Sequence, residues 1–338
     1  MFSEAIPVLD EYELLAFASP EIRCLQGPRF LQSLGILKRA WLFEFADYDD
    51  SPPPDVLDAD RRAVQQYCSN RDELHSILRK RGTNVERSIT YLDLLAPYET
   101  YFGSANPFRY PVVVDISCAP RARLLALLHY LSKCQRLWRQ KIILLYSMVR
   151  GHAVEEEAFS YGIQDIAVVP GFHGQVRLRQ DLLVMVLGFE GNRAFAVYRR
   201  LVPHKAYLIL GDSQDDARDF YIQRARRNNF GLLRIHGTRN YLMASRDPLA
   251  FADSLSKFMQ EVIHPLSNRY NVYFSCLGTK PQTIGAFLAL RSYSYVQLLE
   301  SVPSRRRIGT EGSDKTLFSD FGQSGLLRSI PELLAGYR

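Results

Sequence analysis

Short apolar runs alternate along the chain with segments of helical spacing, most clearly in the C-terminal half. Leu182–Leu187 is a continuous apolar run, Arg193–Leu201 has helical periodicity, and Lys205–Leu210 is a second apolar run. Such runs, bounded by turn residues, are typical of strands buried on both faces of a parallel sheet. Further strands are expected at Gly231–Ile235, Asn271–Ser275 and Tyr295–Leu299, and further helices at Asp215–Asn229, Pro248–His264 and Pro281–Leu290.

The N-terminal half repeats this order. Strands are expected at Leu14–Ala18, Lys38–Phe45, Ser88–Asp93, Pro111–Ser117 and Lys141–Tyr146, and helices at Cys24–Leu34, Val56–Arg81 and Pro120–Leu131. Residues in the turns match as well: Glu21–Arg23 corresponds to Glu190–Arg193, and Ser117-Cys118 corresponds to Ser275-Cys276. Agreement in order and in turn residues predicts an ancient internal duplication.

The predicted fold class is α/β, with two tandem Rossmann-like parallel-sheet units in a chain long enough for two domains. We expect an N-terminal half at 1–150 and a connector with an edge strand near Ile166–Val169 at 151–180. A C-terminal half is expected at 181–305, and a polar loop with a C-terminal helix at 306–338.

Composition bears on the cellular location of the protein and on metal and cofactor sites. No apolar run approaches the roughly 20 residues that cross a bilayer, and the N-terminus lacks the regions of a signal peptide, so a cytoplasmic protein without a membrane partner is expected. The five cysteines show no CxxC pattern and no histidine at metal-ligand spacing, so neither a metal site nor a cofactor is predicted.

Arginine dominates the basic residues, because only eight of the 42 are lysines. GC-rich codon usage explains this bias, and so does recognition of phosphates by the guanidinium fork; composition does not separate the two. The net charge of +6 favours an anionic partner over a cationic one.

Ligands of open parallel sheets bind outside the carboxyl ends of the strands, where turns lead into helix N-termini that suit anions. Four turns are expected there: Ser19–Arg23, Ser117–Arg121, Gly188–Arg193 and Gly278–Pro281. In the last of them, glycine allows close approach, Thr279 can donate a hydrogen bond, and Lys280 adds charge. The predicted ligand-binding residues are Gly278, Thr279, Lys280, Gln282, Gly188, Glu190, Asn192, Arg193, Ser117, Arg121, Ser19 and Arg23.

Two of these turns carry a resemblance to a known family. Leu187–Asn192 matches the Gly-bearing turn, and Val272–Pro281 matches the strand and Gly-Thr-Lys turn, of the CRISPR-associated Rossmann fold (CARF), a sensor of cyclic oligoadenylates. Two such units in one chain are similar to the related SAVED sensor of antiphage signalling. The N-terminal half departs from the pattern, with Ala119-Pro120-Arg121 in place of Gly-Thr-Lys, which implies an altered or lost share of the site.

The resemblance implies a CARF-like internal pseudo-dimer, with Lys280 and Arg121 on opposite sides of one cyclic oligonucleotide or other anionic nucleotide. No effector motif follows the repeat, so a separate effector subunit is expected. No GxSxG, GxGxxG, P-loop or HExxH motif occurs, and no catalytic residue is predicted. A sensor or adaptor in antiphage defence is the preferred function. The alternatives are a non-catalytic structural subunit of a defence complex and a nucleotide-processing, ring-nuclease-like enzyme.

Overall fold

The computed structural model divides the chain into two compact units. Unit 1 comprises Met1–Ala158 together with Arg307–Arg338, and unit 2 comprises Phe159–Arg306. The structure describes residues 11–35, 37–45, 58–79, 84–91, 98, 102, 108–133, 142–147, 151–152, 163–212, 219–244, 247–302, 310–311 and 316–320.

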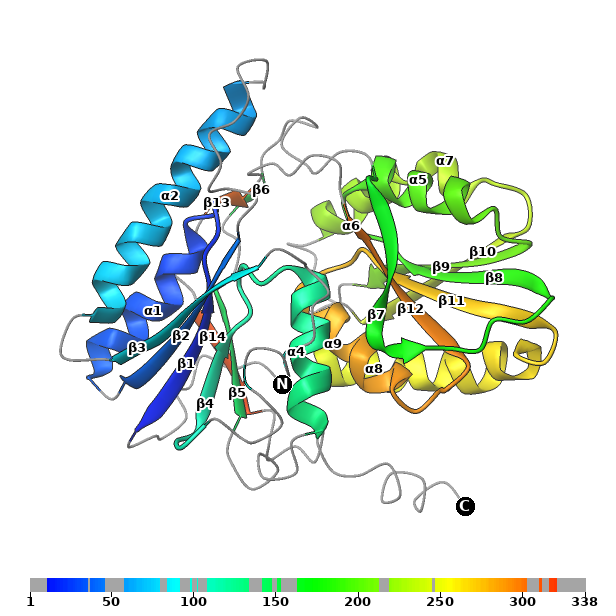
Figure 1. Cartoon of the computed structure of the whole chain (residues 1–338). Helices are drawn as coiled ribbons and strands as arrows, with labels where there is room; N and C mark the ends of the chain where they lie inside the picture. The colour runs from blue at the N-terminus through cyan, green and yellow to red at the C-terminus, as the bar shows by residue number, and fades with distance from the viewer. Residues whose placement is uncertain are drawn as a thin grey trace. The chain divides into compact units, whose positions relative to one another are not determined.

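Unit 1 contains a six-stranded sheet in the order β14-β5-β4-β1-β2-β3 (Figure 1). Its strands are β1 (Tyr12–Phe17), β2 (Leu37–Phe45), β3 (Asn84–Tyr91), β4 (Val112–Asp115), β5 (Ile142–Ser147) and β14 (Thr316–Asp320). Its helices are α1 (Arg23–Leu34), α2 (Asp58–Arg79) and α4 (Arg121–Lys133). All neighbouring strands are parallel except β14, which runs antiparallel to β5.

Unit 2 contains a second six-stranded sheet in the order β10-β9-β8-β11-β12-β7. Its strands are β7 (Asp165–His173), β8 (Gln180–Val186), β9 (Lys205–Asp212), β10 (Thr238–Ala244), β11 (Tyr270–Cys276) and β12 (Val296–Val302). Its helices are α5 (Gly191–Leu201), α6 (Asp219–Asn228), α7 (Phe230–Leu233), α8 (Pro248–Phe258) and α9 (Lys280–Leu290). A π-helical turn (Met259–Ile263) and a 3-10 turn (His264–Leu266) continue α8. In unit 1, a small two-stranded sheet pairs β6 (Gly151–His152) with β13 (Thr310–Glu311).

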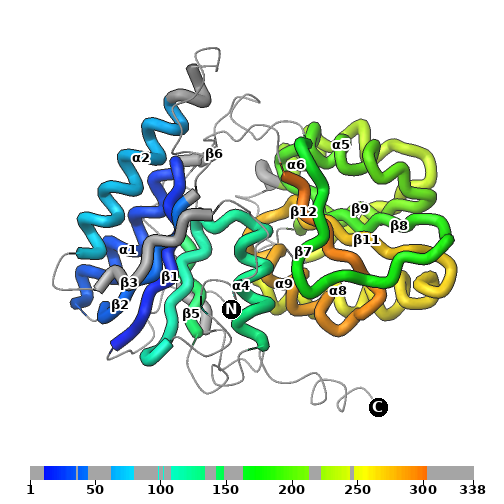
Figure 2. The backbone as a smooth tube through the Cα atoms, in the orientation of Figure 1, coloured from blue at the N-terminus to red at the C-terminus, as the bar shows by residue number. Residues whose placement is uncertain are grey.

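Helices on both faces of the sheet explain why its strands read as unbroken apolar runs. In β8, Leu183 and Met185 pack in one cluster with Ala194 and Val197 of α5. Val184, between them, points to the opposite face and is equally buried. Figure 2 traces α5 and α6 along one side of this sheet and α8 and α9 along the other.

The two sheets have the same strand order. Read from its antiparallel edge, unit 1 runs β14, β5, β4, β1, β2, β3, and unit 2 runs β7, β12, β11, β8, β9, β10. The prediction that β1 corresponds to β8, and β4 to β11, is therefore confirmed. The antiparallel edge strand follows the repeat in unit 1 and precedes it in unit 2.

One predicted strand was wrong. Gly231–Ile235 is not a strand: α7 occupies Phe230–Leu233, and after Gly237, whose φ is +88°, the strand β10 begins at Thr238. A short apolar run such as Leu232-Leu233 suits a buried helix as well as a strand. The polar region at 306–338 also contains strands, β13 and β14, whereas the predicted helix at Ser324–Leu334 lies outside the described residues. The edge strand expected near Ile166–Val169 is part of β7.

A truncation tests the role of β14. A chain that ends at Arg306 lacks β14 and leaves β5, whose Ile142–Leu145 are completely buried, as an open apolar edge that favours aggregation. We expect a lower melting temperature and aggregates in size-exclusion chromatography. A chain that ends at Gly322 retains β14 and is the control; identical behaviour of the two chains would contradict this role.

Candidate functional site

In unit 2, the turns after β8 and β11 are in direct contact. A Cβ atom at Gly188 would lie 2.1 Å from the carbonyl oxygen of Leu277, so only glycine fits there. The two strands are neighbours, with Val186 paired to Cys276, and their carboxyl ends meet at one edge of the sheet. The structure thus brings together two of the turns predicted to face a ligand.

The N-terminus of α9 is capped by side chains of its own first turn. The backbone N–H of Thr279 donates to Gln282 Oε1 (2.9 Å), and Thr279 Oγ1 accepts from the backbone N–H of Gln282 (3.5 Å), which forms a capping box. Gly278 leaves room for this, since a Cβ there would lie 2.3 Å from Gln282 Oε1. The backbone N–H groups of Thr279 and Gln282, which were predicted to bind an anion, are therefore used within the turn. The side chain of Thr279 is exposed, and that of Lys280 is half-buried.

Gln282 retains an unused donor. Its side chain is 2% exposed, and Nε2 has no hydrogen-bond partner among the described residues. The orientation of the amide is fixed, because Oε1 must accept the N–H of Thr279. An unsatisfied buried NH2 group costs about 1–3 kcal/mol, so this amide is suited to a partner beyond the described residues.

Arg193 is engaged by the protein itself. Its side chain is 4% exposed, and it donates to Glu190 Oε2 (2.9 Å), Glu300 Oε1 (3.2 Å) and Ser301 Oγ (2.9 Å). These contacts fasten the first turn of α5 to the end of β12. Glu190 and Arg193, both predicted to bind ligand, thus form an internal ion pair, and Asn192 beside them is exposed.

Arg23 makes the matching contacts in unit 1. Its Nε donates to Glu21 Oε2 (3.1 Å), and its Nη1 donates to the carbonyl oxygen of Ser147 (3.2 Å), at the end of β5. Arg193 Nη2 likewise donates to the carbonyl oxygen of Ser301, near the end of the equivalent strand β12. Each unit therefore contains a buried arginine that links a helix to a strand end.

The remaining predicted residues of unit 1 serve the turns themselves. Ser19 Oγ accepts from the N–H of Glu21 (3.2 Å), and Ser117 Oγ accepts from the N–H of Ser147 (2.8 Å). Arg121 is the half-buried first residue of α4. With Arg23, these three residues belong to unit 1, and the other eight belong to unit 2; a ligand cleft shared by all twelve stays a prediction.

Sequence reasoning missed Asp115, the residue that ends β4. Strand pairing places Val114 between Leu15 and Leu144, as Phe274 lies between Val184 and Leu298, so Asp115 occupies the position of Ser275. This register corrects the match of Ser117 to Ser275 by two positions. The sequence shows that Asp115 follows the apolar run Val112–Val114, but it does not show that the carboxylate is buried.

Asp115 is a buried acid in unit 1. Its side chain is 3% exposed; Oδ1 accepts from the N–H of Ser117 (2.9 Å), and Oδ2 has no partner among the described residues. Burial raises the pKa of this carboxyl to about 6, against the opposing effects of Ser117 and Arg23. With Glu21 on Arg23, two carboxylates face one arginine near this turn, a setting unfavourable to an anionic ligand.

Two asparagines at the end of α6, also missed, hold the β8 turn. Asn228 Nδ2 donates to the carbonyl oxygen of Phe189 (2.8 Å), and Asn229 Nδ2 donates to that of Gly188 (2.8 Å). The Asn-Asn pair after a charged helical segment was the available signal. These contacts fix the turn in place against the sheet.

Neither a metal cluster nor a membrane-spanning helix emerges from the described part of the chain. No group of three or more His, Cys, Asp or Glu side chains there could hold a metal ion. No helix there is both long and apolar enough to cross a membrane.

The chain was compared with known protein families, curated proteins and solved structures. No protein-family model matches the chain. No curated protein matches it either. Among solved structures, it is similar to one described as "Structure of a Type III CRISPR defence DNA nuclease activated by cyclic oligoadenylate", with a TM-score of 0.49 and 12% identity over 86% of this chain and 66% of that chain. The two sheets and their strand order define a two-unit α/β protein with Rossmann-like sheets, and no ligand or activity is transferred to it from that structure.

The contact between the two turns of unit 2 predicts a sharp effect of Gly188→Ala. The added methyl group would meet the carbonyl oxygen of Leu277, so the turns must separate, and we expect destabilisation by about 2–4 kcal/mol in urea denaturation. Gly231→Ala is the matched control, because nothing lies within 4 Å of its Cβ position and alanine favours the helix. Equal stability of both variants would show that the turns do not pack as described.

The raised pKa of Asp115 predicts a stability that falls with rising pH. The unfolded carboxyl ionises near 3.8, whereas the folded one ionises near 6, so its stabilising contribution is complete below pH 4 and is lost as the pH rises through about 6. Between pH 4 and pH 8, we expect Asp115→Asn to gain about 2–3 kcal/mol relative to the wild type. Asp72→Asn, at a side chain 73% exposed, should show no such trend in the same chemical-denaturation series; a flat difference for Asp115→Asn would contradict the burial.

Proposed function

We propose that unit 2 binds an anionic nucleotide at the carboxyl ends of β8 and β11, and that the protein is a CARF-like sensor or adaptor in antiphage defence. The contact between the Gly188 turn and the Gly278–Lys280 turn carries this proposal. It joins the two motifs that resemble the CARF family at the sheet edge where α/β proteins bind ligands.

The groups at this edge suit a phosphate-bearing ligand. Lys280 supplies a cation in the first turn of α9, and Gln282 supplies a buried amide donor without a partner among the described residues. The Thr279 hydroxyl, which hydrogen-bonds to Gln282, holds the turn in place. Arg193 contributes by positioning the turn, because its guanidinium is held by Glu190 and Glu300. A cyclic oligonucleotide, with one charge per nucleotide, is the ligand class proposed.

Unit 1 contributes less to the ligand in this proposal. The turn after β4 leads to Arg121 where unit 2 has the Gly-Thr-Lys motif, Asp115 ends β4, and Glu21 lies in the turn after β1. A separate effector subunit would receive the signal. A protein-binding scaffold is the alternative if no nucleotide binds, and a ring-opening enzyme is the alternative if a bound ring is cleaved.

Calorimetric titration of cyclic di-, tri- and tetranucleotides against the wild type and Lys280→Ala tests the site. Losing one charge-assisted contact should weaken binding about tenfold to a hundredfold. Lys280→Arg should restore part of it, because a planar fork replaces a point charge. Lys257→Ala makes the same charge change in the last turn of α8 and should bind as the wild type does.

Arg121→Ala should weaken binding less than Lys280→Ala. Chromatography of the ligand after incubation detects a linear product and so separates a sensor from a ring-opening enzyme. If no cyclic nucleotide binds the wild type below about millimolar concentration, the sensor proposal fails and the scaffold takes its place.

A further inference from the structure

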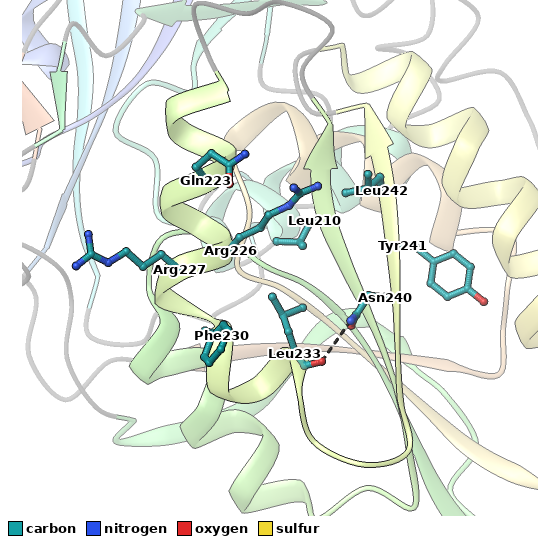
Figure 3. A pocket seen from close by; sticks show the side chains of 9 residues that line it. All are labelled: Leu210, Gln223, Arg226, Arg227, Phe230, Leu233, Asn240, Tyr241 and Leu242. Atoms are coloured by element: carbon teal, nitrogen blue, oxygen red, sulfur yellow. Dashed lines mark hydrogen bonds between the residues drawn. The ribbon is translucent and has the colours of Figure 1, made fainter.

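A second, open groove lies in unit 2 between the helices α6 and α7 and the edge strand β10. It has a volume of about 680 Å³ and is lined by both polar and apolar side chains. Figure 3 shows Arg226 of α6 directed toward the strands, with Phe230 and Leu242 on opposite sides of the hollow. Nothing in the nucleotide site described above uses these residues.

The groove is basic, because its lining includes two arginines and no carboxylate among the described residues. Phe220–Arg246 contains six arginines and no carboxylate, and Asp219 and Asp247 flank this segment. Arg226 is half-buried and Arg227 exposed, and neither guanidinium has a hydrogen bond or ion pair within the part of the chain that the structure describes. In contrast to Arg23 and Arg193, these arginines are available to an anionic partner.

The floor of the groove is a sheet face that α6 and α7 leave partly open. Leu242 of β10 is 52% exposed, and Phe230 at the start of α7 is 54% exposed. Tyr241, which follows the alternation of the strand, points to the other face and packs against Phe258 of α8, with ring centroids 4.8 Å apart. Two large apolar side chains therefore face solvent beside unpaired guanidinium groups.

Polar amides complete the lining. Gln223 precedes Arg226 by one helical turn, and Asn240 lies on the same side of β10 as Leu242, where its amide donates to the carbonyl oxygen of Leu233 (3.3 Å). The guanidinium of Arg234 stacks over the ring of Phe230, with Cζ 4.2 Å from the centroid. A partner must therefore offer anions, flat apolar faces and hydrogen-bonding edges.

We propose that this groove binds single-stranded nucleic acid. Its phosphates would contact Arg226 and Arg227, and an unpaired base would lie on Phe230 and Leu242, because exposed bases present a face for stacking while the backbone follows a basic groove. A duplex keeps its bases stacked inside and would use the arginines alone. The site is independent of the nucleotide site at Lys280, which lies in the turn after β11.

Fluorescence anisotropy of the full chain with fluorescein-labelled dT12 and rU12, titrated at 50 to 200 mM salt, tests the proposal. Arg226→Ala/Arg227→Ala should weaken binding about tenfold or more, and it should reduce the salt slope by about 1.4, since each phosphate contact of a single strand contributes about 0.7. The exposed single change Arg227→Ala should show part of the same effect. It serves as the second variant if the double one does not fold.

The chain offers matched controls on α5. Arg199→Ala/Arg200→Ala removes two adjacent arginines from its last turn, and Phe195→Ala removes a ring that is 42% exposed with Arg199 over it. Both controls should bind as the wild type does, whereas Phe230→Ala should weaken binding about fivefold to a hundredfold. Binding of the cyclic nucleotides and binding of dT12 are measured on the same wild-type protein, so failure of the nucleotide site and failure of this groove are distinguishable.

Competition separates the possible partners. An unlabelled 12-base-pair duplex should displace dT12 less well than unlabelled dT12 does. If poly-glutamate displaces dT12 as effectively and Phe230→Ala has no effect, the groove binds acidic protein and the proposal is overturned. Equal binding by the wild type and Arg226→Ala/Arg227→Ala would also overturn it.

Discussion

A buried arginine fastens the carboxyl edge of each sheet. Arg23 and Arg193 each lie in the first turn of the helix that follows the central strand, and each donates to a serine carbonyl on a strand two positions away in the sheet. A guanidinium can be buried there only because a carboxylate accompanies it, Glu21 in unit 1 and Glu190 with Glu300 in unit 2. These hydrogen bonds hold in position the turns at the carboxyl edge of each sheet.

The hydrogen bonds of these arginines also determine which charges a ligand could meet. An arginine that satisfies its donors on the protein has none to spare for phosphate, so the proposal assigns the positive charge at this edge of unit 2 to Lys280, two residues before Gln282. In unit 1 the equivalent edge carries Asp115 where unit 2 has Ser275. The two copies keep the same scaffold and differ in the side chains that would recognise a ligand.

Local patterns in the sequence predicted what local interactions determine. The alternation of apolar runs and helical spacing predicted most strands, because burial on both faces of a sheet requires a continuous apolar run. The repeated order of these elements predicted that the two units share one strand order. The partners of Arg193 could not be predicted, since Glu300 lies 107 positions away and a pairing at that range is set by the folded sheet. The strand β14 was missed for a similar reason: its partner β5 lies far back in the chain, and a polar edge strand carries little apolar signal.

The distribution of charge bears on the two explanations of the arginine content. Unit 2 has 19 basic residues among 148, and unit 1 has 23 among 190, so basic residues have nearly the same density in both, and arginine outnumbers lysine in both. A preference that extends across the chain is what codon usage would produce. Carboxylates differ: 11 lie in unit 2 and 25 in unit 1, so unit 2 carries a net charge of +8 and unit 1 of −2. Depletion of acid in one unit is not a consequence of arginine codons. It lowers the repulsion that an anionic ligand would meet in the unit that holds both the Gly278–Lys280 turn and the groove at Arg226.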